Sequence, residues 1–144
     1  NITTNGATVE GDMPLVDKIH NWFVIKFGNN HIAKFCENID EFDLKAEYVK
    51  AKGYKPFNKI KDFNMSIFKI CGDIIKIRTY ENGTGETLSC GSATLSVACA
   101  LSKELDLKKF KFSSRGGITK VYISNDSVIS EARAQVLEEG FLDG

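Results

Sequence analysis

Apolar and polar positions follow two different rhythms in the first third of the chain. The segment NWFVIKFGNNHIAKFC (21–36) contains two β-rich runs separated by Gly28-Asn29-Asn30, which predicts two strands. The segment EFDLKAEYVKAKG (41–53) places apolar residues among charges and ends at a glycine, which predicts an amphipathic helix. The apolar residues of this helix are Phe42, Leu44, Ala46 and Val49.

A β-hairpin is predicted in the middle of the chain. FNMSIFKI (63–70) and DIIKIRTY (73–80) both carry the alternation of a half-buried strand, and they flank Cys71-Gly72, where a turn fits. A loop with three glycines follows, and a helix is expected from about Gly91 to Leu105. No charged residue occurs from Thr87 to Ser102, so this helix is apolar nearly all round, and such helices are buried on every side.

The last third of the chain returns to strand patterns. KKFKFSS (108–114) and TKVYIS (119–124) look like strands joined across Gly116-Gly117. The segment 127–142 is ambiguous, and its Ser, Val and Ile content favours strands. Together these elements predict an α+β domain in which a mixed or antiparallel sheet is rolled around one buried helix.

Composition limits the function classes. A chain of 144 residues with 42% hydrophobic residues is expected to form a single domain, here residues 1–144. Nineteen basic residues balance nineteen acidic ones, so charge gives no argument for a nucleic acid or membrane partner. The N-terminal segment lacks the basic and apolar regions of a signal peptide, which favours an intracellular, cytoplasmic protein.

The four cysteines are at positions 36, 71, 90 and 99, and no two of them form a C-x-x-C pair. This spacing argues against a zinc site or a thioredoxin-type redox motif, so no metal is predicted. For most of them a buried thiol is the expected state.

Cys90 differs because it directly precedes the predicted buried helix. The first turn of a helix has unpaired N–H groups and the positive end of the helix dipole, which stabilise a thiolate or hold a carboxylate. Cys90 could therefore act as a base or nucleophile, and Glu81 and Glu86 could exchange protons with it. A tight glycine turn capped by a small apolar residue remains the plainer alternative. The glycines that would let a ligand approach the backbone are Gly83, Gly85 and Gly91.

Four motifs in this sequence resemble the diaminopimelate epimerases. YENGTGETLSCGSA (80–93) is similar to the C-terminal signature of that family, and GNNH (28–31) is similar to its Gly-Asn-Pro-His. FNMSI (63–67) is similar to its Asn-Val-Asn-Phe strand, and RGG (115–117) lies where the family has Gly-Gly between strands. The four occur in the family's order, and the resemblance covers most of the chain.

The resemblance implies a cofactor-independent epimerase built from two similar halves, each a sheet rolled around a central helix. It further implies that two cysteines, one from each half, face opposite sides of the substrate α-carbon. One thiolate removes the α-proton and the other thiol delivers a proton, which converts LL- to meso-diaminopimelate in lysine and cell-wall precursor biosynthesis.

Site roles follow from this resemblance residue by residue. Cys90 matches one catalytic thiol, Glu81 matches the carboxylate that works with it, and His31 matches the histidine that works with the opposite thiol. The predicted substrate-binding residues are Asn29, Asn64, Asn82, Gly91 and Ser92, of which the last two would grip the α-carboxylate through their amides.

Two positions depart from the family pattern. Asn82 stands where the family has an arginine for the distal carboxylate of diaminopimelate, and a neutral amide cannot form a bidentate ion pair. Arg78, on the preceding strand, is a candidate replacement. Ala93 replaces a glycine in the first turn of the helix, a change that the helix should tolerate.

The resemblance covers only the C-terminal half of such an enzyme, so the N-terminal half with the second thiol is expected to come from outside this chain. The predicted partners are therefore that half-domain and an amino-acid substrate, and a homodimer is also allowed. Three other functions stay open: a two-thiol racemase with another substrate, a non-catalytic carboxylate-binding module, and, more weakly, a Cys-His hydrolase that uses Cys90 and His31.

Overall fold

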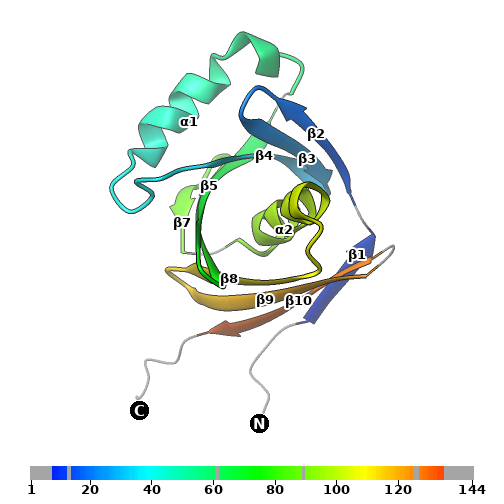
Figure 1. Cartoon of the computed structure of the whole chain (residues 1–144). Helices are drawn as coiled ribbons and strands as arrows, with labels where there is room; N and C mark the ends of the chain where they lie inside the picture. The colour runs from blue at the N-terminus through cyan, green and yellow to red at the C-terminus, as the bar shows by residue number, and fades with distance from the viewer. Residues whose placement is uncertain (1–7, 13, 61, 89, 125–126, 135–144) are drawn as a thin grey trace.

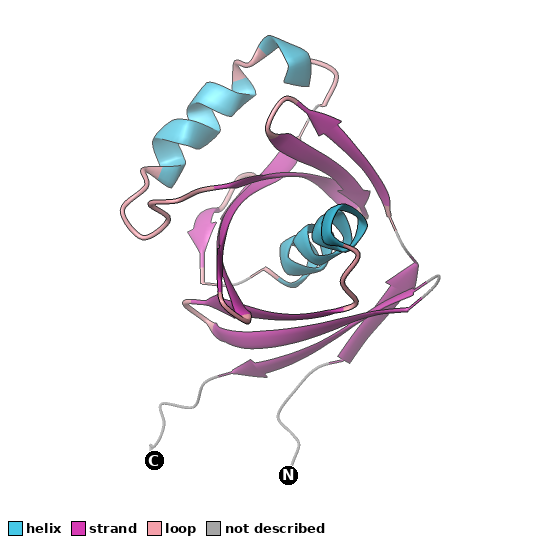
Figure 2. Ribbon diagram, in the orientation of Figure 1, coloured by secondary structure: helices cyan, strands magenta, loops and turns pink. Residues whose placement is uncertain are grey.

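The computed structural model describes residues 8–12, 14–60, 62–88, 90–124 and 127–134. Within them, ten strands form one sheet that curls around a single helix, α2, and a second helix, α1, lies outside the curl (Figures 1 and 2). The predicted architecture of a sheet rolled around a buried helix is confirmed. The strands are β1 (Thr8–Asp12), β2 (Leu15–Ile19), β3 (Trp22–Phe27), β4 (Asn29–Phe35), β5 (Phe63–Cys71), β6 (Ile74–Glu81), β7 (Gly85–Thr87), β8 (Lys109–Ser114), β9 (Gly117–Ser124) and β10 (Ser127–Ala134), and the helices are α1 (Leu44–Lys52), α2 (Gly91–Leu105) and a 3-10 turn at Lys55–Phe57.

The sheet is mixed because two of its connections contain a helix. Its order is β1-β10-β9-β8-β6-β5-β4-β3-β2, with β7 paired to β6. Neighbours are antiparallel except for β4 with β5 and β6 with β8. A parallel pair needs a long crossover. The chain between β4 and β5 contains α1, and the chain between β6 and β8 contains α2.

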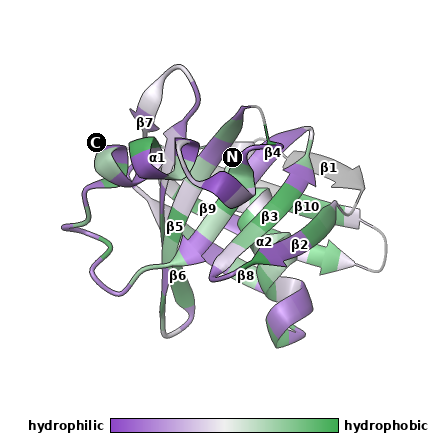
Figure 3. Cartoon of the chain, turned by 90° about the horizontal axis from the view of Figure 1, so that it is seen from above, coloured by the Kyte–Doolittle hydropathy of each residue, from purple (hydrophilic) through white to green (hydrophobic). Residues whose placement is uncertain are grey.

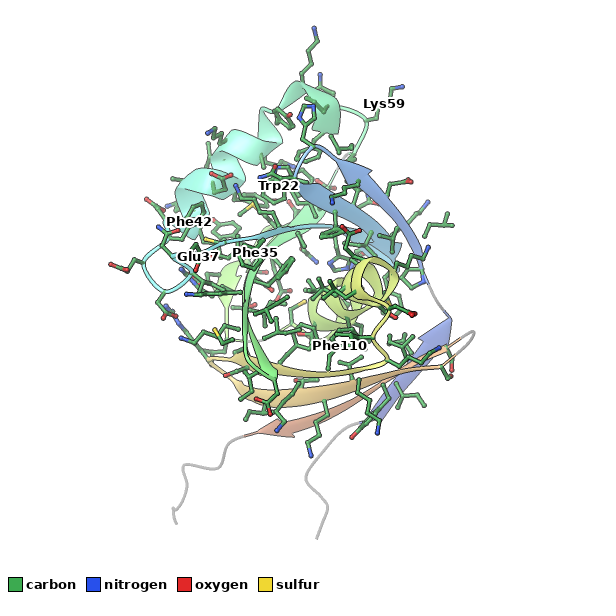
Figure 4. All side chains as sticks on the ribbon, in the orientation of Figure 1. Trp22, Phe35, Glu37, Phe42, Lys59 and Phe110 are labelled. Atoms are coloured by element: carbon green, nitrogen blue, oxygen red, sulfur yellow. The ribbon has the colours of Figure 1, made fainter. Side chains whose placement is uncertain are left out.

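Helix α2 has the predicted bounds and the predicted burial. All nine residues from Ala93 to Leu101 are buried. Its polar side chains satisfy themselves within the helix, since Thr94 Oγ1 donates to Cys90 O at 3.0 Å and Ser96 Oγ donates to Ser92 O at 2.7 Å. The hydroxyl groups of Thr94 and Ser96 are therefore hydrogen-bonded, although the helix lies inside the sheet. Phe110 of β8 lies inside the curl beside it (Figure 4).

Helix α1 covers a second apolar cluster on the outer face of the sheet. It begins at Leu44, not at residue 41, because the Asp43 side chain accepts a hydrogen bond from Ala46 N at 3.0 Å and caps the helix. Its buried residues are Leu44, Tyr48 and Ala51, spaced four and three residues apart. The expectation that Ala46 and Val49 belong to the apolar face is wrong, since both are exposed, Val49 to 65%.

The other predicted strands are present with small shifts at their ends. The hairpin turn between β5 and β6 lies at Gly72-Asp73, one residue later than expected, and Gly72 has a φ of +65° that favours glycine. Strand β9 begins at Gly117, two residues before the predicted start. β10 confirms the strand preference for the start of 127–142, and residues 135–142 lie outside the described part of the chain.

The strands carry both apolar and polar segments (Figure 3). In β6 the buried residues alternate with partly exposed ones, as predicted for a half-buried strand. In β5 four consecutive residues from Met65 are buried, because the inner face contacts the α2 side and the outer face lies under α1. Among the described helices, none is long and apolar enough to cross a membrane.

Candidate active site

A cavity of about 500 Å³ opens where the β3–β4 turn, the start of β5 and the end of β6 meet. This size suits a small-molecule ligand. The cavity brings together four of the predicted site residues with five others that were not predicted as site residues, three of which, Gly28, Asn30 and Phe63, belong to the motifs. It is lined by Lys26, Gly28, Asn29, Asn30, Asp62, Phe63, Asn64, Glu81 and Asn82.

Two asparagines of this wall are fixed by hydrogen bonds. The backbone N–H of Asn82 donates to Asn64 Oδ1 at 2.8 Å, and Tyr48 Oη donates to Asn82 Oδ1 at 2.8 Å. Tyr48 is itself held against Tyr80, with ring centroids 4.4 Å apart. Both side-chain oxygens are therefore occupied, which leaves the amide NH₂ groups as the donors available to a ligand.

His31 lies on β4 beside Asn64 in the parallel register between β4 and β5. It is 2% exposed, and neither ring nitrogen makes a hydrogen bond of good geometry with a described residue, although the Phe27 backbone lies close enough to act on the ring. Burial lowers the pKa of the imidazole, and the backbone of Phe27 and the Glu81 carboxylate oppose that shift. A buried histidine with both nitrogens unpaired is costly, so it is a group that a ligand or partner would stabilise.

Cys90 is the N-cap residue of α2, with extended backbone angles and a partly buried side chain. Its carbonyl accepts the first hydrogen bond of the helix, from Thr94 N at 3.0 Å, and its Sγ lies 3.5 Å from Ser92 Oγ. The N–H groups of the first turn, including those of Gly91 and Ser92, point out of the helix end without intrahelical acceptors. A Cβ on Gly91 would meet nothing within 4 Å, so space is open there.

The structure thus divides the predicted site residues into two groups. Asn29, Asn64, Glu81 and Asn82 share the cavity. Cys90, Gly91 and Ser92 lie at the start of α2, His31 is buried, and none of these four lines the cavity.

The glycine turn between β6 and β7 links the two groups along the chain. Thr84 N donates to Glu81 O at 3.1 Å, which closes a tight turn. Gly83 and Gly85 have φ values of +81° and +97°, which side-chain-bearing residues adopt only with strain. The turn itself therefore requires glycine at these two positions.

Arg78 and Glu86 do not have the roles considered for them from the sequence. Arg78 Nε and Nη2 donate to the Glu86 carboxylate at 2.7 and 2.8 Å, and Nη1 donates to Ile39 O and Phe42 O at 2.6 and 2.9 Å. This ion pair lowers the pKa of Glu86. Arg78 does not line the 500 Å³ cavity and is committed to protein partners, so it does not replace the missing arginine. Glu86 is held as a paired carboxylate and is poorly suited to carry protons.

The remaining cysteines have different surroundings. Cys36 and Cys99 are buried, and burial raises the pKa of both thiols, that of Cys99 to about 12. Cys71 is exposed at the end of β5. All four cysteines are free thiols.

Comparison with known proteins gives a consistent relationship. The chain is 33% identical over 118 residues to a diaminopimelate epimerase of Archaeoglobus fulgidus, an alignment that covers 80% of this chain and 41% of the relative. A diaminopimelate epimerase of Rhodococcus opacus is 28% identical over 144 residues, or 97% of this chain and 48% of the relative. The chain is a homologue of the diaminopimelate epimerases. It spans less than half the length of these curated relatives.

A shorter alignment with the diaminopimelate epimerase of Wigglesworthia glossinidia brevipalpis is 43% identical over 79 residues, covering 53% of this chain and 27% of the relative. No family model matches the chain. Among solved structures, a PhzC/PhzF phenazine biosynthesis protein from Clostridium difficile has a TM-score of 0.51 at 18% identity, covering 67% of this chain and 35% of that one. This likeness concerns the fold alone.

Proposed function

We propose that this chain supplies one half of the active site of a cofactor-independent diaminopimelate epimerase. The observation that carries the proposal is the placement of Cys90 at the N-terminus of the buried helix α2, in a chain homologous to that family. The amides of Gly91 and Ser92 would hold the substrate α-carboxylate, where the helix dipole also favours negative charge.

The chemistry requires proton transfer on both faces of the α-carbon. In one direction the Cys90 thiolate takes the α-proton and becomes a thiol, while a second thiol, supplied by another half-domain, gives its proton to the opposite face and becomes a thiolate. Negative charge that develops toward the carboxylate during this step is stabilised by the α2 amides. No redox change and no cofactor is needed, and the protein would act in the cytoplasm on the path to lysine and cell-wall precursors.

Glu81 and His31 have supporting roles in this proposal. Glu81 lines the cavity and its charge acts on His31, so the two groups lie near one another. Glu81 would restore the protonation state of Cys90, and the unpaired nitrogens of His31 would serve the opposite thiol. The asparagines of the cavity would bind the remainder of the substrate.

The test uses the complete protein, with the half-domain that carries the second thiol. We expect Cys90→Ala to lower exchange of the diaminopimelate α-proton with D₂O by about a hundredfold or more, since general acid–base groups contribute about 10²–10⁴-fold. Cys71→Ala is the matched control, because Cys71 is an exposed thiol at the β5–β6 hairpin and should leave exchange unchanged.

The 144-residue chain by itself should not epimerise amino acids, because one thiol cannot serve both faces of the α-carbon. Turnover of both enantiomers by the isolated chain, or full activity of the Cys90→Ala protein, would contradict the proposal.

A further inference from the structure

The 500 Å³ cavity contains a single cation among its described lining residues, Lys26 of β3. Lys26 forms no ion pair with any described residue, unlike six other basic side chains that do. A charge that lines a cavity without a protein partner is suited to a charged ligand group. Resting on the proposed function, we infer that Lys26 binds the second, distal carboxylate of the substrate and makes the site selective for dicarboxylic amino acids.

The neighbouring amides are oriented to support this role. Asn82 Oδ1 accepts from Tyr48 Oη of α1, so the NH₂ group of Asn82 remains as its donor for a ligand. Lys26 lies opposite Asn30 in the antiparallel register of β3 and β4, and such partners share a face of the sheet. Asn64 pairs with His31 in the β4–β5 register and projects from the other face, so the donors nearest to Lys26 are the amides of Asn30 and Asn82. An ammonium group beside amide donors is complementary to a carboxylate.

The competing cations are accounted for elsewhere. Arg78 donates hydrogen bonds to Glu86 and to two backbone carbonyl groups, and it does not line this cavity. Lys52 approaches Asp62 to 3.7 Å and does not line the cavity wall. The distal ammonium group of the substrate has its own complement in the Asp62 carboxylate. An amino acid with a second carboxylate and a second ammonium group therefore matches the wall better than one with an uncharged side chain.

Cys90, Gly91 and Ser92 do not line this cavity, so the α-carboxylate grip at α2 is separate from the wall that holds Lys26. Two carboxylates can then be held at two places, one by helix amides and one by an ammonium group. Lysine differs from diaminopimelate by the absence of the distal carboxylate, so the pair of ligands isolates the contribution of Lys26.

The experiment measures binding of meso-diaminopimelate and of lysine by calorimetry, in the complete protein carrying Cys90→Ala so that no turnover occurs. We expect Lys26→Met to weaken diaminopimelate binding by about tenfold to a hundredfold and to leave lysine binding unchanged. Lys26→Arg keeps the charge and should retain most of the affinity. Lys59→Met is the control, because Lys59 is exposed, is not on the cavity wall and points away from the molecule (Figure 4).

Equal losses for both ligands, an effect of Lys59→Met as large as that of Lys26→Met, or no binding of diaminopimelate would overturn the inference. Lys26 is exposed, so Lys26→Met should leave the thermal unfolding temperature unchanged. A lowered unfolding temperature would show that Lys26 has a structural role and would overturn the inference. The proposed function is tested separately, by measuring α-proton exchange in the complete protein that retains Cys90. Selective diaminopimelate binding without exchange would defeat that function and leave the assignment of Lys26 standing.

Discussion

The ion pair between Arg78 and Glu86 makes a quantitative prediction about stability. The pair joins β6 to β7 with two parallel hydrogen bonds, and the side chains of Arg78 and Glu86 are 13% and 24% exposed. Arg78 also holds the segment before α1 through the carbonyls of Ile39 and Phe42. One guanidinium group therefore ties three segments of the chain together.

The magnitude follows from the number and kind of bonds. A hydrogen bond to a charged group contributes about 1.5–3 kcal/mol, and this pair is partly buried, so water screens it less than a fully exposed pair. We expect Glu86→Ala to lower the free energy of unfolding by about 1.5–3 kcal/mol. Arg78→Ala should cost more, about 3–5 kcal/mol, because it also leaves the two carbonyls without their donor. The coupling between the two sites in a double-mutant cycle should be about 1.5–3 kcal/mol.

Urea unfolding at pH 7 measures these free energies, and the neighbouring pair Lys76–Asp40 supplies the control. Lys76 also lies on β6, and its Nζ is 3.0 Å from Asp40 Oδ2, but the two side chains are 45% and 72% exposed. An exposed pair contributes little, so no measurable coupling is expected for it. Equal coupling energies for the two pairs, or no coupling between Arg78 and Glu86, would refute the reasoning.

The same pair predicts a pH dependence. Arg78 lowers the pKa of Glu86 in the folded protein below its ordinary value of 4.5. The unfolded state therefore binds the proton more readily, and the stabilisation is present in full above pH 4.5. It is lost as the pH falls through the lowered pKa, so the coupling energy should shrink in acid. A coupling that grows as the pH falls would contradict the assignment.

Two further predictions concern Cys90 and Asn82. Iodoacetamide should modify Cys90 before Cys36 and Cys99, because Cys90 is partly exposed at the N-terminus of α2, whereas Cys36 and Cys99 are buried and burial raises the pKa of both thiols. Peptide mapping that finds Cys36 or Cys99 modified first would contradict this order. Asn82→Arg in the complete protein should tighten diaminopimelate binding about tenfold or more and leave lysine nearly unaffected. It should also restore affinity to the Lys26→Met protein, since an arginine would supply the missing charge at the same cavity. Calorimetry on the single and double variants checks this, and a double variant that binds diaminopimelate no better than Lys26→Met would contradict it.

Several features of the protein could be predicted from the sequence because they depend on local chemistry. The absence of charge between residues 87 and 102 predicted a helix buried on all sides, and α2 has the expected bounds. Gly28 and Gly72 marked turns because both adopt a positive φ that other residues avoid. Of the eight site residues predicted from the motifs, four share one cavity, namely Asn29, Asn64, Glu81 and Asn82.

Other features were decided only when distant segments met. The short strands β1, β2 and β7 carry weak periodicity and exist because each pairs with a partner in the sheet, as β1 does with β10. The orientation of α1 depends on which side faces the outer cluster, so Val49 is exposed although the residue is apolar.

The least predictable features are charges whose partners lie far along the chain. Arg78 is eight residues from Glu86 and more than thirty from the carbonyls it contacts, so the sequence left it free to be assigned to the substrate. No motif in the sequence points to Lys26, and its proposed role in substrate binding depends on the end of β3 forming one wall of the cavity. Local propensity and hydrophobic pattern therefore determined the helix and the turns of this protein, whereas tertiary packing decided which charges are paired and which remain for a ligand, because pairing depends on distances in space that sequence spacing does not record.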